Sequence, residues 1–358
     1  MNVRISTVAS AQVTGGPGLG PTNYSSGIPI FLQKWWLNTV GNAVSVQEAQ
    51  SFEVGEVIGS LSYIEHFNKA GILFGGNLPW TTLGGPILAQ NLSEDRKRQV
   101  LDQLLAQLPK RTSFIFVCSP DATDADLIKQ SFKIAGFALS KRVTYSRSPE
   151  DVEVLGLLKR KSRAHIKAAD KNLTIIDISA EEFADFYAEN LRDAGVASYS
   201  PLHVARDLIA EGISRKQVRA IAAKKRIVGS LDNRCFDAAI ACAWDEDRYH
   251  YWLSTRRHYS DGNADDKANP DAIKVLILRA MSHAQEKRLI FEVDCVNPGD
   301  NHLFGKILKI QKEESRNVFT RYTWLARSFL KYRPMVPQKL AACARLALPQ
   351  WHLLGPVC

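Results

Sequence analysis

The sequence contains few cysteines, and they follow no pattern. None of the six forms a C-x-x-C pair and their spacing does not recur, which argues against both a zinc ribbon and a disulfide framework. The eight histidines show no H-E-x-x-H motif and no Cys/His ligand spacing, so no metal site is predicted. A P-loop and a G-x-S-x-G elbow are also absent, which argues against P-loop nucleotide hydrolysis and serine hydrolase chemistry.

Long apolar runs are missing as well. No stretch of about 18 apolar residues, the length needed to cross a bilayer, occurs in the chain. The first 20 residues lack the apolar core, roughly 7 to 15 residues long, of a secretory signal peptide. We therefore expect a cytoplasmic protein, and peripheral contact with the inner face of the membrane is left open.

The composition that remains is that of a globular protein. The 358 residues are 45% hydrophobic and carry a net charge of +9, which excludes the disordered and fibrous classes. At roughly 100 to 200 residues per domain, this length predicts two domains. We expect a flexible leader over 1–27 and a basic tail over 326–358. Between them we expect an N-terminal domain over 28–149 and a C-terminal domain over 150–325.

The positive charge is concentrated in two blocks. Residues 214–226 contain six Lys/Arg and no acidic residue. Residues 312–358 contain eight Lys/Arg and two Glu, a local charge of +6. Such blocks favour phosphate-rich partners such as tRNA, a CoA diphosphate or anionic lipid heads. The alternative is a solvated basic face that keeps the protein soluble.

The N-terminal domain alternates strands and helices. Apolar residues in 28–40 predict an extended segment that passes into a short amphipathic helix. Two strands joined by a turn near 69–71 follow, and the Gly and Pro around Trp80 indicate backbone packed closely against a ligand or a neighbouring sheet. We then expect a helix capped by Ser93, a strand over 113–118, a helix over about 124–135 and a strand over 137–146.

The C-terminal domain repeats this alternation. A basic helix over 157–172 leads to a strand over 173–178 and two further helices. A meander of three strands comes next, followed by a long amphipathic helix and a last strand. The expected ranges are 180–191 and 201–211 for the two helices, 217–223, 227–233 and 236–255 for the meander, 271–287 for the long helix and 288–294 for the last strand.

Four segments stand in order along the chain. They are IPIFLQKWWL, LPWTTLGGPIL, the basic helix LLKRKSRAHIKAADKN, and RYHYWLST with the helix and carboxylate-ended strand that follow it. Together they resemble the bacterial FemAB/FemX aminoacyltransferases and the related acetyltransferases of cellulose and exopolysaccharide operons. This resemblance implies an α/β (α+β) fold of two tandem domains of the GNAT (N-acetyltransferase) type, with mixed central sheets flanked by helices.

The resemblance also implies a reaction. An acyl or aminoacyl group would pass from an activated donor to an amine in the biosynthesis of a cell-envelope or secreted glycan, peptide or lipid. The co-substrate would be acyl-CoA, an acyl-carrier protein or aminoacyl-tRNA, with no tightly bound cofactor. After the strand ending near 255 the chain lacks the Arg/Gln-x-x-Gly-x-Gly/Ala spacing with which CoA-using members hold the diphosphate.

Two alternatives to this reaction are kept. One is an N-acyltransferase that depends strictly on acyl-CoA or an acyl carrier and acts on an amino sugar or a long-chain amine. The other is a non-catalytic scaffold that binds RNA or an anionic precursor through the basic blocks. The oligomeric state is left open.

Acyl transfer to an amine needs a proton acceptor and donors for the oxyanion. Glu292 and Asp294 lie two apart on the last predicted strand and so share one face. We select Asp294, at the strand end, as the candidate base and Lys306 as the candidate for an oxyanion or phosphate. The alternatives are a solvent-facing acidic pair at a sheet edge and a hydrated lysine on an amphipathic helix.

One departure from the resemblance concerns the acceptor. Members that build peptidoglycan bridges often carry Asp before Pro after the first central strand, whereas this chain has Ser119 before Pro120. A peptidoglycan lysine acceptor is therefore disfavoured. The residues expected to contact substrates are Gln33, Trp36, Trp80, Thr82, Ser119, Arg163, Tyr249, Tyr251, Trp252, Arg256 and Arg257, although the aromatic ones could equally belong to the core.

Overall fold

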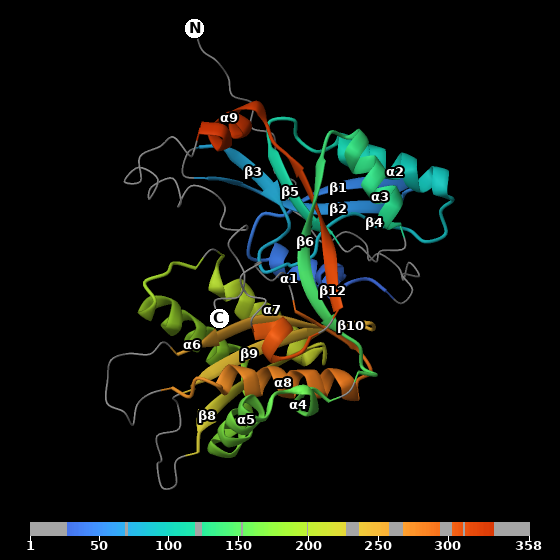
Figure 1. Ribbon diagram of the computed structural model, residues 1–358. Helices are drawn as coiled ribbons and strands as arrows, with labels where there is room; N and C mark the ends of the chain where they lie inside the picture. The colour runs from blue at the N-terminus through green and yellow to red at the C-terminus, as the bar shows by residue number, and fades with distance from the viewer. Residues whose placement is uncertain are drawn as a thin grey trace.

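The computed structural model describes residues 27–68, 71–118, 124–151, 153–198, 200–226, 236–257, 268–293, 303–310 and 312–332. Its strands lie in one sheet with the order β1-β2-β3-β5-β12-β6-β11-β10-β9-β8-β7, and β4 pairs with β2 at one side. Figure 1 shows this sheet as an upper and a lower half, with β6 and β12 running between them. The predicted leader over 1–27, apart from Gly27, and the part of the predicted tail over 326–358 that lies beyond Tyr332 fall outside the described residues.

The elements of the upper half follow the expected alternation. Strand β1, which the sequence analysis missed, comes before the two predicted strands β2 and β3. The bounds are η1 Ile30–Leu32, α1 Lys34–Gly41, β1 Gln47–Glu53, β2 Glu56–Phe67, β3 Leu73–Gly76, β4 Ile87–Leu88, α2 Glu94–Ala106, β5 Ser113–Cys118, α3 Ala125–Ile134 and β6 Ala138–Arg147.

The lower half contains the predicted helices and a meander divided differently from the prediction. The bounds are α4 Val154–Leu157, α5 Arg160–Asn172, β7 Leu173–Asp177, α6 Ala180–Asp193, α7 Leu202–Ser214, β8 Val218–Lys225, β9 Ala238–Trp244, β10 Arg248–Arg256, α8 Ala272–Glu286, β11 Ile290–Val293, η4 Leu303–Ile307, β12 Lys312–Arg321 and α9 Trp324–Tyr332.

The single strand predicted over 236–255 was wrong. The structure has two antiparallel strands there, β9 and β10. The side chain of Asp245 ends the first of them by accepting hydrogen bonds from the backbone N–H groups of Asp247 at 3.0 Å and Arg248 at 2.8 Å. An aspartate that bonds its own backbone two or three residues on is a strong turn former. The strand predicted over 227–233 lies outside the described residues.

Two strands link the halves of the sheet. β12, near the end of the described chain, lies between β5 and β6, while β6 also pairs with β11 of the lower half. The sequence analysis considered an amphipathic helix around Lys306, and the described structure has the short π-helical turn η4 there, before β12 begins. One sheet continues through both halves of the protein. The domain boundary predicted near Pro149 stays a prediction.

Three apolar clusters form the core. The first lies under α2 and α3 in the upper half, and the second lies between α5, α8 and one face of the lower sheet. The third lies on the opposite face under α6 and α7, and it includes Trp36 and Trp80 from the first part of the chain. This third cluster therefore joins the two halves.

Local sequence signals account for the helix ends. Ser93 caps α2 by accepting the N–H of Arg96 at 3.3 Å, as predicted, and acidic residues occupy the first turn. A capping box between Ser179 and Glu182 starts α6. Such caps satisfy N–H groups that the helix itself leaves unpaired.

Candidate active site

Strands β10 and β11 pair in parallel over four residues in the described part of the chain, and we call the edge of β10 beyond the last of these pairs the opening. The pairs run from Arg248 with Ile290 to Tyr251 with Val293. In the described part of the chain β11 ends at Val293, whereas β10 continues to Arg256. Over its last residues, β10 therefore has no described strand beside it on this side.

The ladder between β10 and β9 determines which backbone groups face this opening. The N–H of Arg257 donates to the carbonyl of Asp237 at 3.0 Å, and hydrogen-bonded pairs recur at every second residue of an antiparallel ladder. Thr255 therefore also bonds β9, whereas the N–H and C=O groups of Ser254 and Arg256 point to the other side. The backbone of these two residues therefore faces the opening, on the side where β11 lies earlier along β10.

A β-bulge lies at the start of the opening. The register with β9 shifts between Tyr251 and Leu253, so Trp252 is the extra residue. Because a bulge breaks the alternation of side chains, Trp252 and Leu253 both pack in the cluster under α6 and α7, while Tyr251 packs on the other face. Bulges of this kind often redirect side chains beside functional sites.

Three tryptophans tie the loop after β3 to this bulge. Trp252 donates from Nε1 to the carbonyl of Trp80 at 2.8 Å, and Trp80 donates to the carbonyl of Pro201 at 2.9 Å. Trp36 donates to the hydroxyl of Thr81 at 3.0 Å. The indole N–H groups of Trp36, Trp80 and Trp252 are thus used inside the protein, so any contact with a substrate would be made by ring surfaces.

The dense Gly and Pro around Trp80 reflect packing against a neighbouring strand. The N–H of Gly84 donates to the carbonyl of Val117 in β5 at 2.7 Å. A Cβ added at Gly84 would lie 2.2 Å from Oδ1 of Asn77, a contact that no side chain can make. Trp80 itself has a φ of 60°, which is uncommon for a bulky residue. The expected close packing against a sheet is therefore present.

Gln33 and Thr82 complete the predicted residues of the upper half that can be placed. Oε1 of Gln33 accepts hydrogen bonds from Trp35 at 2.8 Å and Gln217 at 3.0 Å, so this side chain connects α1 to the start of β8. The buried hydroxyl of Thr82 has no hydrogen-bond partner in the described part of the chain. Because a buried unpaired hydroxyl is costly, Thr82 is the more suitable of the two for contact with a ligand.

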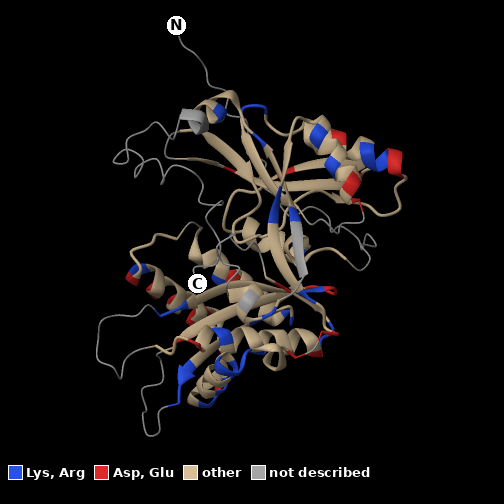
Figure 2. Cartoon of the chain, in the orientation of Figure 1, with Lys and Arg blue, Asp and Glu red and all other residues tan. Residues whose placement is uncertain are grey.

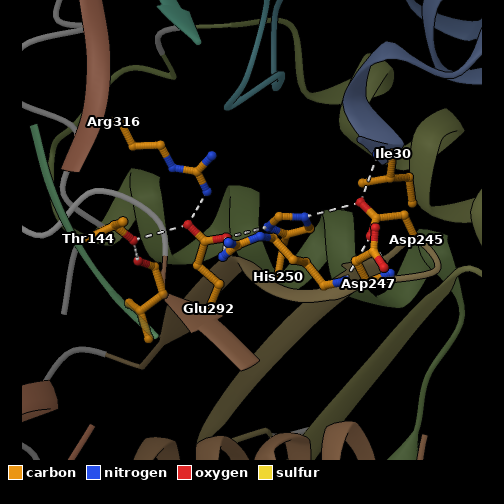
Figure 3. Close-up of polar contacts among 9 residues, drawn as sticks. Ile30, Thr144, Asp245, Asp247, His250, Glu292 and Arg316 are labelled. Atoms are coloured by element: carbon orange, nitrogen blue, oxygen red, sulfur yellow. Dashed lines mark hydrogen bonds and ion pairs between the residues drawn. The ribbon is translucent and has the colours of Figure 1, made fainter. Parts of the chain in front are cut away.

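A chain of buried charged residues crosses the strands beside the opening. Glu292 on β11 is fully buried, and its carboxylate pairs with Arg316 on β12 and with Arg248 at 3.1 Å. The ring of His250 lies between two carboxylates, 3.6 Å from Glu292 and 3.5 Å from Asp245. Figure 3 shows Arg316, Glu292, His250 and Asp245 in this order, from β12 to the turn before β10. We call these five residues the buried charge network.

The buried charge network connects segments that are distant in the sequence. Asp245 accepts the backbone N–H of Ile30 at 3.1 Å, and Thr144 on β6 donates to Glu292 at 3.3 Å. Burial alone would raise the pKa of Asp245, but His250 and the N–H groups of the turn outweigh it and lower that pKa. Removing one partner of a buried ion pair typically costs about 3 to 5 kcal/mol. The network therefore fixes β11, the start of the opening, against β12 and the segment around residue 30.

Glu292 is thus neither solvent-facing nor at a sheet edge, because β11 lies between β6 and β10. With two arginines on its carboxylate, it acts as a buried counter-ion. Asp294 and Ser119 lie outside the described residues. Lys306 lies on η4, and its side chain is also outside the described part of the structure. The predicted roles of these three residues stay predictions.

Tyr249 and Tyr251 lie on the face of β10 that packs against α8. The hydroxyl of Tyr249 lies 3.0 Å from Nδ1 of His283, and burial raises the pKa of Tyr249. The ring of Tyr251 packs edge-on against Phe304 of η4, with 5.8 Å between centroids. Tyr249 thus belongs to the core, while Tyr251 lies beside the end of the parallel pairing.

The predicted arginines separate into two groups. Nη2 of Arg163 donates to the carbonyls of Gly156 at 3.0 Å and Leu158 at 2.9 Å, so this side chain holds the connection between α4 and α5. Arg256 and Arg257 lie at the end of β10, and the side chain of Arg256 is exposed. These two lie where a donor would enter the opening.

Sequence reasoning missed Arg316, His250 and Asp245. Arg316 belongs to a charged stretch that was counted as part of the basic tail region, and His250 stands alone between two tyrosines. The partners come from different strands, so no spacing along the chain could have indicated them. In the described residues no group of His, Cys, Asp and Glu could hold a metal ion, and no described helix could cross a membrane.

The order of the elements and the topology of the sheet define the fold class. Helices on both faces of a mixed sheet, with an antiparallel meander, a crossover helix and a short parallel strand, form the lower half. The upper half shares this sheet, so the expected α/β architecture, with a mixed sheet flanked by helices, is confirmed.

Comparison with solved structures supports the same class. FemX matches with a TM-score of 0.55 over 84% of this chain and 93% of its own, at 11% identity. The C-terminal domain of a putative lysylphosphatidylglycerol synthetase from Agrobacterium fabrum matches with a TM-score of 0.51 over 79% and 86%, at 13% identity. No protein-family model and no curated protein matches the sequence. The resemblance to FemX-type proteins is therefore confirmed at the level of the fold.

Proposed function

We propose that the protein is an N-acyltransferase that binds an activated acyl donor at the opening, the edge of β10 beyond its pairing with β11. The observation that carries the proposal is the backbone of Ser254 and Arg256, which faces this opening within a FemX-like fold. An extended donor can pair with such groups as a strand would. The same N–H groups can stabilise the oxyanion that forms when an amine attacks a carbonyl.

The reaction balances with residues of this chain. The acceptor nitrogen attacks the carbonyl carbon, a C–N bond forms, and the bond to the leaving oxygen or sulfur breaks. One proton must pass from the nitrogen to the leaving group, and an acceptor present as an ammonium must first lose another proton. The candidate base stays Asp294, which in the sequence directly follows Val293, the last described residue of β11.

The acceptor would approach from the side of the loop after β3. Trp80 is hydrogen-bonded to the bulge of β10, and Thr82 follows two residues later with a buried, unpartnered hydroxyl. A hydroxyl in this state can orient an amine or a carbonyl oxygen. The acceptor class we propose is an amine of a cell-envelope, glycan, peptide or lipid precursor.

For the donor, we favour aminoacyl-tRNA over acyl-CoA. A CoA diphosphate would need the N-terminus of α8. There the N–H of Asp271 bonds Oδ1 of Asn269 at 2.9 Å, and the N–H of Asn269 bonds Asp237 at 3.2 Å. The N–H groups before the helix are thus already used, and the carboxylate of Asp237 lies beside them, while Asp271 pairs with Lys274. These contacts disfavour a diphosphate at the helix start. An aminoacyl ester brings no diphosphate to this position.

The test first compares acyl donors and then removes one backbone N–H group. The protein is incubated with charged tRNA, acyl-CoA or acyl-carrier protein and with amino sugar, lysine or long-chain amine acceptors, and amide product is measured. We expect product from charged tRNA. Ser254→Pro removes the N–H at the opening and should lower the rate about 10²-fold or more, while Ser254→Ala should keep it. Product from none of these donors, with no thermal stabilisation by any, would favour the non-catalytic scaffold.

A further inference from the structure

Helix α5 has exposed cations without partners. Arg160, Lys161, Lys167 and Lys171 are exposed, as is Lys159 at the helix start. Within the described structure none of these five side chains forms an ion pair or a hydrogen bond. We call them the α5 cations. Nearby acids do not neutralise them, since Asp170 pairs with Arg279 at 2.8 Å and Asp177 with Arg219 at 2.6 Å.

Three of the α5 cations form a line. Residues 160, 167 and 171 are spaced by seven and four, so they lie on one side of the helix. At 1.5 Å per residue, the line from Arg160 to Lys171 is about 16 Å long. The opposite side of α5, with Ile166 and Ala169, packs on the core. The line of charge is therefore fixed in direction by a packed helix.

The charge continues from α5 onto the sheet. The N–H of Arg226 donates to the carbonyl of Asn172, and Lys225 lies opposite Leu173. Residues 224–226 thus adjoin the C-terminal end of α5. Figure 2 shows the Lys and Arg of α5 and of the end of β8 gathered at the bottom of the lower half.

The same end of the sheet leads to the opening. Ala223 of β8 lies opposite Ala238 of β9, which lies opposite Arg256 of β10. With strands about 4.8 Å apart, residues 224–226 lie roughly 10 Å to the side of Arg256 and Arg257. The α5 cations, residues 224–226 and the end of β10 therefore form a basic path that ends where the donor would enter.

We propose that this basic path binds the phosphate backbone of an RNA, the acceptor arm of a tRNA, whose 3′ end enters the opening at Arg256. The proposal deepens the proposed function and rests on it for the identity of the RNA. The α5 cations supply the unpaired Lys and Arg side chains in a row that phosphate recognition requires. A membrane surface fits less well, because a helix that lies on lipid must expose an apolar face and that of α5 is buried.

The test uses two matched variants. One neutralises three α5 cations, as Arg160→Gln, Lys167→Gln and Lys171→Gln. The control neutralises three cations of α2, as Arg96→Gln, Lys97→Gln and Arg98→Gln, and so changes the net charge equally. The probe is an uncharged tRNA acceptor-stem hairpin with a single-stranded CCA end, and its affinity is measured by fluorescence anisotropy across a salt series.

We expect the α5 variant to bind the hairpin about tenfold or more weakly at low salt. Its slope of log K against log salt should fall by about 2 to 3, or roughly one for each cation removed. The α2 control should bind as the wild type does. Equal losses in both variants, or no loss in the α5 variant, would overturn the proposal. So would loss of binding to phosphatidylglycerol vesicles with unchanged RNA binding.

A second readout separates this inference from the proposed function. Suppose that the α5 variant forms product from sub-saturating charged tRNA at the wild-type rate. The proposal that the basic path binds tRNA is then wrong, while the proposed acyl transfer stands. If the α5 variant loses hairpin binding while the wild-type protein transfers nothing from charged tRNA, the basic path stands and the proposed donor is wrong.

Discussion

Helices α2 and α5 are both thirteen residues long and both carry several Lys and Arg, yet these cations are used differently. Each cation of α2 has an acidic partner, as Arg96 pairs with Glu53 at 3.0 Å, Lys97 with Asp124 at 2.9 Å and Arg98 with Glu94 at 3.4 Å. The α5 cations have none in the described structure. The difference shows that a count of Lys and Arg does not identify a binding surface, whereas the partners of those residues do.

A third use of a cation is found in the interior of the protein. Arg316 is a cation like those of α5, but it is buried against Glu292 and serves to fix β11. The basic block over 312–358 therefore includes at least one cation that no polyanion can reach. Pairing and burial together separate charges that stabilise the protein from charges that are available to a partner.

The largest effect is expected from removing a buried partner. Arg316→Met leaves the carboxylate of Glu292 buried with one of its two arginines missing, and the free energy of unfolding should fall by about 3 to 5 kcal/mol. Chemical denaturation measures this. In the double variant Arg316→Met with Glu292→Met, which leaves neither charge, much of the loss should be recovered. A single variant as stable as the wild type would contradict the structural role of the buried charge network.

A smaller effect is expected from pH. The pKa of Asp245 is lowered in the folded protein, so its stabilisation is complete above its unfolded pKa of about 3.9 and is lost as the pH falls through its folded pKa. The wild type should therefore lose stability below about pH 4, and Asp245→Asn should make this loss less steep.

The control for the pH experiment is an exposed carboxylate with a shift in the same direction. The pKa of Asp126 is also lowered, by a hydrogen bond from Lys129, but this carboxylate is in water. Asp126→Asn should leave the pH dependence of unfolding almost unchanged. Equal flattening by both variants would show that burial of Asp245 does not matter.

The smallest effect is expected from making α2 resemble α5. Glu53→Gln, Glu94→Gln and Asp124→Asn remove the partners of the α2 cations, and each exposed pair should be worth about 0.2 to 1 kcal/mol of stability. The variant should bind the acceptor-stem hairpin a little more strongly than the wild type, because three cations become available. Product formation from charged tRNA should not increase, since α2 lies far from the opening in the sheet order.

Local signals in the sequence predicted much of the fold. Ser93 identified the start of α2, and apolar periodicity located α5 to α8 within a few residues. The strand β12 could not be predicted, because KEESRNVFTR has five charged residues in ten and reads as surface. Its burial depends on β5 and β6, which are distant in the sequence.

The site was predictable only in part. Trp36, Trp80 and Trp252 were selected separately, and the structure brings them together in one cluster. His250 and Arg316 gave no signal, since each has meaning only beside Glu292 from another strand. The opening itself depends on where the parallel pairing of β10 ends, and no pattern of residue types specifies that.

The most direct test of the account is a single-turnover measurement of acyl transfer from charged tRNA by the wild type, Ser254→Ala and Ser254→Pro. The account predicts equal rates for the first two and a loss of about 10²-fold or more for the proline variant, with its thermal stability close to that of the alanine variant. A proline variant that folds and transfers at the wild-type rate would contradict the placement of the donor between β10 and β11.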